Sequence, residues 1–150
     1  MIVDTSALVA MLRGEADAER YSESLRRAGG ARISAATYVE IAAVIDGQGD
    51  PVLSGALDEL LRTYGIQIEP LTEAQARQAR GAYQRFGKGS GHPARLNLGD
   101  CFAYGLARDL DESLLFKGKD FALTDIEIVI EPIKERRLSE VVAAYGTGAP

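Results

Sequence analysis

Cysteine and histidine are almost absent from this chain, which has one of each, Cys101 and His92. A single cysteine cannot form a disulfide within the chain, and this pair provides too few ligands for a structural zinc site. No apolar stretch approaches the roughly 20 residues that a helix needs to cross a bilayer. The start has no basic leader, and Asp4 and Arg13 interrupt its apolar run. We therefore expect a cytoplasmic protein without a secretory signal or a membrane span.

Acidic residues are missing from positions 74–99, although the chain as a whole has a formal charge of −5. The same stretch contains all of these basic or titratable side chains: Arg77, Arg80, Arg85, Lys88, His92 and Arg95. A local basic strip of this kind suits the phosphate backbone of a nucleic acid. A solvated helix face followed by a basic loop explains the strip equally well, so both interpretations stay open.

The apolar pattern predicts helices and strands in alternation. Helices are expected at residues 7–12, 16–28, 37–45, 51–64, 72–86 and 97–110, with a glycine-rich loop at 87–93. Strands are expected at 1–3, 32–34, 66–69, 113–116 and 127–130, the last as a candidate edge strand. This order indicates an α/β fold with a mainly parallel central sheet sandwiched by helices. A length of 150 residues suits one domain, which we place at 1–145, with a frayed tail at 146–150.

Three acids occupy unusual places in this pattern. Asp4 follows the first strand, at the carboxyl edge of the sheet where ligands bind in open α/β folds. Glu40 is the only charged residue in the helix expected at 37–45, and Asp100 lies near the start of an almost entirely apolar helix. Ionised groups on such apolar elements are costly unless they are paired or bound to a metal.

Helix capping is the simpler explanation for each of these acids taken singly. Asp4 can cap the helix that follows it, and the spacings Thr37 to Glu40 and Asn97 to Asp100 fit capping boxes. A shared divalent cation explains all three acids at once. Because carboxylate oxygens are hard ligands, the expected ion is Mg²⁺, with Mn²⁺ as the alternative.

Four motifs give the chain a family resemblance. They are Ile-Val-Asp4-Thr-Ser-Ala-Leu, Ser-Ala-Ala-Thr-Tyr-Val-Glu40, Leu-Asn-Leu-Gly-Asp100-Cys-Phe-Ala-Tyr-Gly-Leu-Ala and Leu-Leu-Phe-Lys-Gly-Lys-Asp120-Phe. In this order they resemble a PIN-domain ribonuclease of the VapC toxin type, over nearly the whole chain. The resemblance implies a PIN-like fold and Mg²⁺-dependent endonucleolytic cleavage of RNA. It further implies a cognate antitoxin partner and a homodimer, with Asp4, Glu40 and Asp100 as the three principal acids.

The fourth acid of the family departs from the pattern here. Many members place it in a Thr-x-Asp step after the fourth strand, where this chain has Phe116, Lys117 and Gly118. Asp120 is the nearest carboxylate, and Asp125 is the second choice. A site of three acids remains the alternative.

The residues support metal-assisted hydrolysis as the mechanism. Asp4 and Asp100 are the expected metal ligands, and Glu40 is expected to orient or deprotonate the attacking water. Ser6 and Asn97 are expected to hydrogen-bond the phosphate or the ligands, with helix capping as their alternative role. The expected contacts to the RNA backbone are Arg85, Lys88 and Arg95.

Two other functions compete with this hypothesis. The first is a non-catalytic PIN-like partner-binding module with a vestigial acid pocket, which Gly118 favours and the three principal acids oppose. The second is an aspartyl-phosphate phosphatase. That family needs a second acid two residues after the nucleophile, and Ser6 occupies this place.

Overall fold

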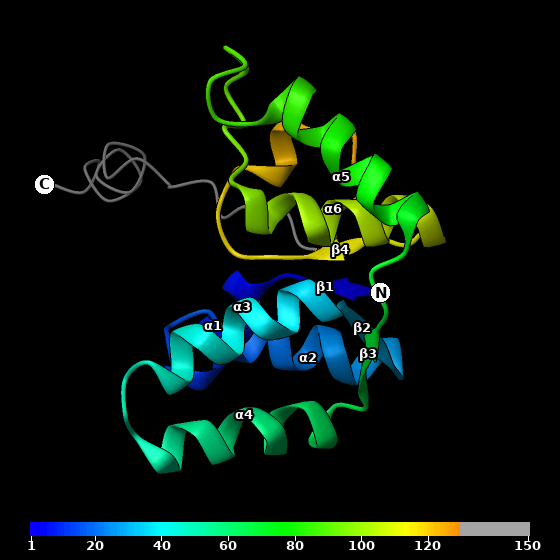
Figure 1. Ribbon diagram of the computed structural model, residues 1–150. Helices are drawn as coiled ribbons and strands as arrows, with labels where there is room; N and C mark the ends of the chain where they lie inside the picture. The colour runs from blue at the N-terminus through cyan, green and yellow to red at the C-terminus, as the bar shows by residue number, and fades with distance from the viewer. Residues whose placement is uncertain (130–150) are drawn as a thin grey trace, which may run out of the picture.

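The computed structural model describes residues 1–129. This part of the chain forms four strands and six helices, followed by a short 3₁₀ helix (Figure 1). The strands are β1 (Ile2–Val3), β2 (Ala31–Ser34), β3 (Ile66–Glu69) and β4 (Leu114–Leu115). The helices are α1 (Thr5–Leu12), α2 (Ala18–Ala28), α3 (Ala35–Asp46), α4 (Pro51–Thr63), α5 (Glu73–Phe86), α6 (Leu98–Leu110) and the 3₁₀ helix η1 (Phe121–Leu123). None of the described helices is long and apolar enough to cross a membrane.

The four strands form one parallel sheet in the order β3-β2-β1-β4. Strand β1 is central, and its two residues, Ile2 and Val3, are fully buried. Successive residues of a strand point to opposite faces, and these two side chains enter different apolar clusters. Helices therefore cover both faces of the sheet, as the sequence predicts for an α/β fold.

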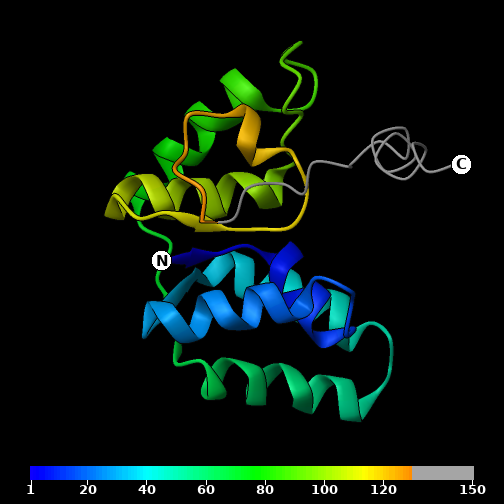
Figure 2. The same ribbon diagram turned by 180° about the vertical axis from the view of Figure 1, so that it is seen from behind.

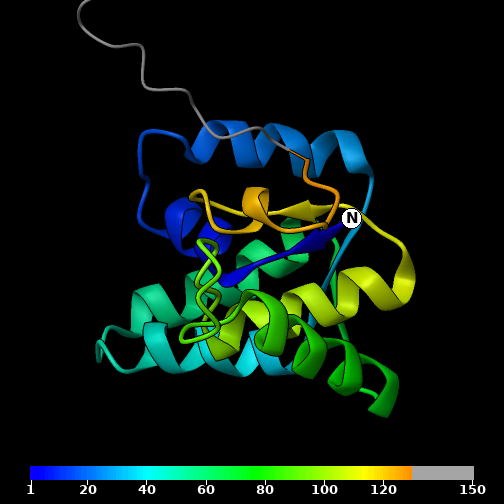
Figure 3. The same cartoon turned by 90° about the horizontal axis from the view of Figure 1, so that it is seen from above.

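The helices fall into two groups around these clusters. Figures 1 and 2 show α5 and α6 at one end of the molecule, beyond β4, with α2 and α4 toward the other end. Seen from above, α2 lies on one side of the sheet and α5 and α6 lie on the other (Figure 3). The amino end of α6 and the carboxyl end of β1 lie on the same side of the molecule (Figures 1 and 2).

Helices α5 and α6 pack closely because Gly105 lies at their contact. A Cβ atom on Gly105 would lie 2.6 Å from the backbone oxygen of Gln75 on α5. Helix α6 is buried along most of its length, including the fully buried side chain of Tyr104. The helix that carries Asp100 is therefore held rigidly between α5 and the sheet.

Several boundaries differ from those expected from sequence. Helix α1 begins at Thr5, because the Asp4 side chain caps it, and α3 begins at Ala35, because Ser34 caps it. The strand expected at 127–130 is wrong as a full strand within the described residues, where Ile128 forms a single parallel bridge to Leu114. Its place at the edge beside β4 agrees with the prediction. The end of the expected domain at 145 and the tail at 146–150 lie outside the described residues.

Candidate active site

Asp4 lies at the carboxyl end of β1 and is 3% exposed. Its Oδ2 accepts hydrogen bonds from the backbone N–H of Ser6 at 3.0 Å and from the Ser6 hydroxyl at 2.6 Å. Burial raises the pKa of Asp4 above its usual range, although the bonds from Ser6 favour the charged form. The residue therefore caps α1 and also presents a buried carboxyl group at the edge of the sheet.

Ser6 connects Asp4 to the loop that follows β4. Its Oγ accepts a hydrogen bond from the backbone N–H of Lys117 at 2.9 Å while it donates to Asp4. The Lys117 side chain is paired in turn with Glu15 and with Asp17, the latter at 3.2 Å. These contacts fix the loop that leads to Asp120 against the start of α1.

Asp100 lies in the first turn of α6 and forms the expected capping box with Asn97. Its Oδ2 accepts from the Asn97 N–H at 2.8 Å, and its own N–H donates to Asn97 Oδ1 at 2.8 Å. Burial, together with the negative charges of Asp4, Asp120 and Glu40, raises the pKa of Asp100 to about 7, although the bond from the Asn97 N–H favours the charged form. Capping and membership of an acidic cluster are thus combined in one side chain.

Glu40 reaches the cluster from α3. An ideal Cβ atom on Gly99 of α6 would lie 1.7 Å from Glu40 Oε2, so the carboxylate occupies the space that a side chain at Gly99 would fill. The capping box expected between Thr37 and Glu40 is wrong, because the helix starts earlier at its cap Ser34. Thr37 is buried inside the first turn, and its hydroxyl has no hydrogen-bond partner in the described structure.

The fourth acid that faces this cluster is Asp120. Its charge contributes to the raised pKa of Asp100, whereas Asp125 is engaged elsewhere. Asp125 accepts a hydrogen bond from the Tyr104 hydroxyl at 2.6 Å and pairs with Arg85 at 3.2 Å. Of the two carboxylates considered from sequence, the structure brings Asp120 toward Asp100 and ties Asp125 to α5 and α6.

The chemistry of this donor set fits an oxygen-coordinated divalent cation. Burial and neighbouring negative charge oppose the ionisation of Asp4 and Asp100, and a bound cation would supply the counter-charge. Within residues 1–129, however, no three His, Cys, Asp or Glu side chains already stand in an arrangement that holds an ion. The hydrogen bonds from Ser6 and Asn97 set the present orientations of Asp4 and Asp100.

The basic strip divides into paired and unpaired cations. Arg77 pairs with Glu73 at 2.6 Å, and Arg85 donates to the buried Tyr104 hydroxyl at 2.8 Å besides pairing with Asp125. Lys88 and Arg95 are exposed and form no ion pair within the described part of the chain. Arg85 therefore has bonding partners that the sequence did not indicate, and the RNA contacts expected of Arg85, Lys88 and Arg95 stay a prediction.

His92 lies in the loop between α5 and α6 and is half-buried. Its Nδ1 accepts a hydrogen bond from the Ala94 N–H at 3.1 Å, and its ring meets Phe86 edge-on at 4.9 Å. These contacts hold the loop together.

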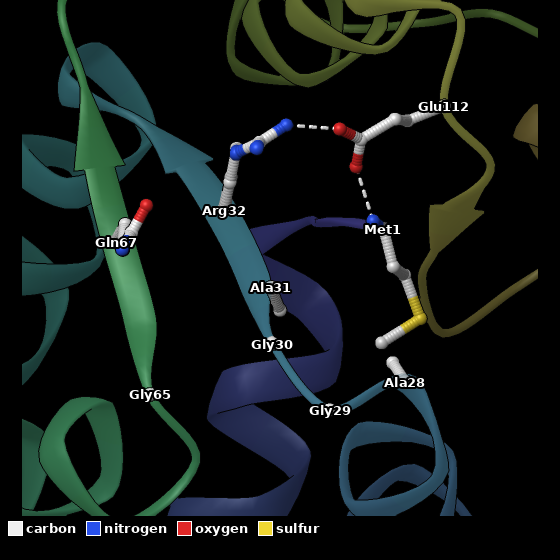
Figure 4. A pocket seen from close by; sticks show the side chains of 9 residues that line it. All are labelled: Met1, Ala28, Gly29, Gly30, Ala31, Arg32, Gly65, Gln67 and Glu112. Atoms are coloured by element: carbon white, nitrogen blue, oxygen red, sulfur yellow. Dashed lines mark hydrogen bonds and ion pairs between the residues drawn. The ribbon is translucent and has the colours of Figure 1, made fainter.

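A polar pocket of about 410 Å³ lies at the opposite, amino edge of the sheet (Figure 4). Arg32 of β2 and the amino group of Met1 both bind Glu112 there, and Arg32 also lies 3.3 Å from Glu69. The pocket floor includes Gly29, Gly30 and Gly65. Its charges are already paired with one another, and it contains none of the acids described above.

Sequence comparison provides the deciding observation on family. The pattern of the PIN domain family matches residues 1–127. The ribonuclease VapC28 of Mycobacterium tuberculosis is 53% identical over 131 residues, which are 87% of this chain and 98% of that protein. The chain belongs to the PIN-domain family of VapC ribonucleases. A second VapC ribonuclease of the same species, VapC42, is 51% identical over 126 residues, covering 84% of this chain and 96% of that protein.

Solved structures place the fold of this VapC-type chain in the same group. A chain from a toxin-antitoxin complex of Klebsiella pneumoniae superposes with a TM-score of 0.65 at 18% identity, covering 88% of this chain and 98% of that one. VapC20 of M. tuberculosis, described as a sarcin-ricin loop cleaving toxin, superposes with a TM-score of 0.66 at 16% identity. The match covers 85% of this chain and 97% of that one. At such identities these likenesses establish the fold alone.

Proposed function

We propose that this VapC-type protein is a Mg²⁺-dependent endoribonuclease that cleaves RNA by metal-assisted hydrolysis. The observation that carries the proposal is that Asp4, Glu40 and Asp120 lie close enough to Asp100 for their charges to raise its pKa, at one edge of the sheet. Relatives that are named ribonucleases at about half identity support the substrate class.

Asp4 and Asp100 would hold the ion, because they are the two acids whose ionisation burial and repulsion oppose most clearly. When bound, Mg²⁺ supplies a counter-charge for the scissile phosphate and lowers the pKa of a coordinated water. Ser6 and Asn97 orient the two ligands through the hydrogen bonds already formed in the structure.

We assign the attacking water to Glu40 as part of this proposal. Its carboxylate lies against Gly99, beside the turn that carries Asp100, and its charge acts on both Asp4 and Asp100. In the proposed mechanism Glu40 accepts a proton from the water or orients it toward phosphorus, and Asp120 adds negative charge near Asp100.

We further propose that a cognate antitoxin controls the enzyme and that the enzyme acts as a homodimer. A chain of a toxin-antitoxin complex shares the fold, which together with the VapC names of the relatives supports the antitoxin. A cationic side chain of the inhibitor entering the acid pocket would replace the charge of the metal. An antitoxin complex that cleaves RNA at the rate of the free enzyme would contradict this arrangement.

The test is incubation of the purified protein with structured and unstructured RNA, with Mg²⁺ and with excess chelator. We expect cleavage only with the divalent ion, and its loss in the Asp4→Asn variant. Cleavage that survives thorough chelation would overturn the proposed mechanism. A protein that binds antitoxin but never cleaves RNA would instead be the non-catalytic binding module.

A further inference from the structure

Arg95 has an unusual backbone conformation. Its φ angle is +50°, in the left-handed region that residues with a side chain rarely adopt. Within residues 1–129 the other non-glycine residue with positive φ is Asp111, which is the C-cap of α6, where this conformation is common. Arg95 ends no helix; it lies between the turn at 93–94 and the bridge at Leu96.

The surrounding chain fixes the Arg95 backbone on both sides. Ala94 and Leu96 are fully buried in the apolar cluster of α5 and α6. The Leu96 N–H donates to the Phe86 oxygen at 2.8 Å, and the Lys88 N–H donates to the Leu96 oxygen at 2.9 Å. With both neighbours directed inward, the side chain of Arg95 is directed into solvent.

The buried neighbours Ala94 and Leu96 hold this conformation, and the Arg95 side chain adds no contact to it within the described residues. Arg95 is exposed and forms no hydrogen bond or ion pair there, whereas Arg77 and Arg85 on the preceding helix are both paired. Glycine or asparagine would adopt the same backbone more easily. Strained residues of this kind concentrate where the side chain serves binding.

The position of Arg95 suggests what it binds. It lies two residues before Asn97, the cap of α6 that also orients Asp100, so it flanks the acid cluster. Lys88 lies across the pairing between 87 and 96, which puts a second unpaired cation on the same loop. Figure 1 shows this loop extending beyond the ends of α5 and α6.

We propose that Arg95, together with Lys88, binds the phosphodiester backbone of single-stranded RNA next to the scissile bond, and that the left-handed backbone at Arg95 is retained for this contact. The inference rests on the proposed function only for the identity of the substrate. A guanidinium group binds phosphate oxygens in bidentate fashion, so Arg95 provides the stronger contact of the two. Arg85 differs from these two cations because its side chain already binds Tyr104 and Asp125.

The experiment measures RNA binding in EDTA, where no bond is broken, with a fluorescent single-stranded RNA at several salt concentrations. Asparagine tolerates the left-handed backbone, so Arg95→Asn removes the charge without adding strain. We expect affinity to fall about tenfold, the salt dependence to flatten by roughly 0.7 in slope, and the melting temperature to stay the same or rise.

Two variants serve as matched controls. Arg95→Lys keeps the charge and the backbone and should lose less affinity than Arg95→Asn. Arg80→Gln removes another exposed arginine, on α5, that forms no ion pair within the described residues, and should leave affinity nearly unchanged. Wild-type affinity and salt slope in Arg95→Asn, or equal losses in Arg80→Gln, would overturn the inference.

The two proposals fail in distinguishable ways. A wild-type protein that binds RNA through Arg95 in EDTA but does not cleave it with Mg²⁺ contradicts the ribonuclease proposal and supports the binding inference. A protein that cleaves RNA while Arg95→Asn keeps full affinity contradicts the binding inference alone. Absence of any RNA binding by the wild-type protein contradicts both.

Discussion

Asp100 shows that capping and a metal-site role are compatible in a single side chain. Its capping box with Asn97 is complete, yet its carboxylate also lies close enough to Asp4, Glu40 and Asp120 for their charges to raise its pKa. Asp100 Oδ2 accepts a hydrogen bond from the Asn97 N–H, which has no partner within the helix. The negative charge of the same carboxylate interacts with those of the other three acids. The capping explanation is therefore confirmed for this residue, and the metal-site explanation remains the proposal.

The raised pKa of Asp100 makes metal-free stability depend on pH. Because its folded-state pKa of about 7 exceeds the ordinary value of 3.8, its contribution to stability is fully present below about pH 4 and is lost as pH rises through 7. Asp100→Asn keeps an oxygen that accepts from Asn97 and removes the charge. Thermal melts in EDTA should therefore show a smaller drop between pH 5 and pH 8.5 in this variant than in the wild type.

At pH 8.5 the variant should be at least as stable as the wild type. If capping were the whole role of the Asp100 carboxylate, the substitution would lower stability by about 1 kcal/mol at that pH. A variant that melts lower than the wild type at pH 8.5 would contradict the repulsion inferred here.

Gly99 positions Glu40 by leaving space for it. A Cβ atom there would overlap Glu40 Oε2, and because this is the end of a flexible side chain, Gly99→Ala should move the carboxylate and leave the backbone in place. We expect RNA cleavage to fall at least tenfold while the melting temperature changes little, since misplacement by about 1 Å can cost 10²-fold in rate.

Gly81→Ala is the matched control, because this helical glycine on α5 has open space where its Cβ would lie. It should keep full activity and gain slight stability from the better helix propensity of alanine. Equal activity in the Gly99 and Gly81 variants would contradict the role assigned to Glu40.

At the residue scale the sequence marks the candidate acids as unusual but does not mark the residues that contact them. Asp4, Glu40 and Asp100 stand out because charge is rare on apolar elements. Gly99 and Tyr104 do not, since a glycine and an aromatic residue in a helix are ordinary in sequence and acquire their roles only through contacts with other elements. Arg85 is likewise an ordinary exposed cation in the sequence, and its bonds to Tyr104 and Asp125 are visible only in the structure.

At the scale of elements, α6 is the one that organises the site. Its first turn carries Asp100, Gly99 accommodates Glu40 of α3, and Tyr104 anchors both Arg85 of α5 and Asp125 after η1. The Tyr104 hydroxyl thus ties together three segments that are far apart in the chain. This network fixes the segment that follows Asp120 against the helix of Asp100.

Loss of the Tyr104 hydroxyl should loosen this network. Tyr104→Phe removes one hydrogen bond from a guanidinium and one to a carboxylate, so we expect a loss of about 1–3 kcal/mol in unfolding free energy, measured by urea denaturation. Tyr83→Phe, at a side chain that is 43% exposed on α5, should change stability far less. Equal losses in the two variants would show that the network contributes nothing.

Most element types were predictable, because long amphipathic or apolar segments have a clear period. The ends of the helices were less predictable. The N-caps Asp4 and Ser34 make α1 and α3 begin earlier than the apolar pattern indicates. The segment at 127–129 has the composition of a strand, but it pairs with β4 through one bridge only. The apolar periodicity of a segment predicts an extended conformation, but it does not predict how many hydrogen bonds the adjacent strand forms with that segment.

At the scale of the whole molecule, parallel topology explains why acids distant in sequence act together. The carboxyl ends of parallel strands share one edge, and the helices that follow β1 and β2 start there, bringing Asp4 and Glu40 toward Asp100. The net charge of −5 gives no general attraction for RNA, so the proposed affinity rests on the local cations Lys88 and Arg95.

Magnesium binding by the metal-free protein, measured by calorimetry, tests the central claim most directly. The wild type and Asp58→Asn, a change at an exposed carboxylate on α4, should bind Mg²⁺ alike, whereas Asp100→Asn should bind at least tenfold more weakly. Asp100→Asn binding as tightly as the wild type, or a wild type that binds no Mg²⁺, would contradict a metal site built from Asp4 and Asp100.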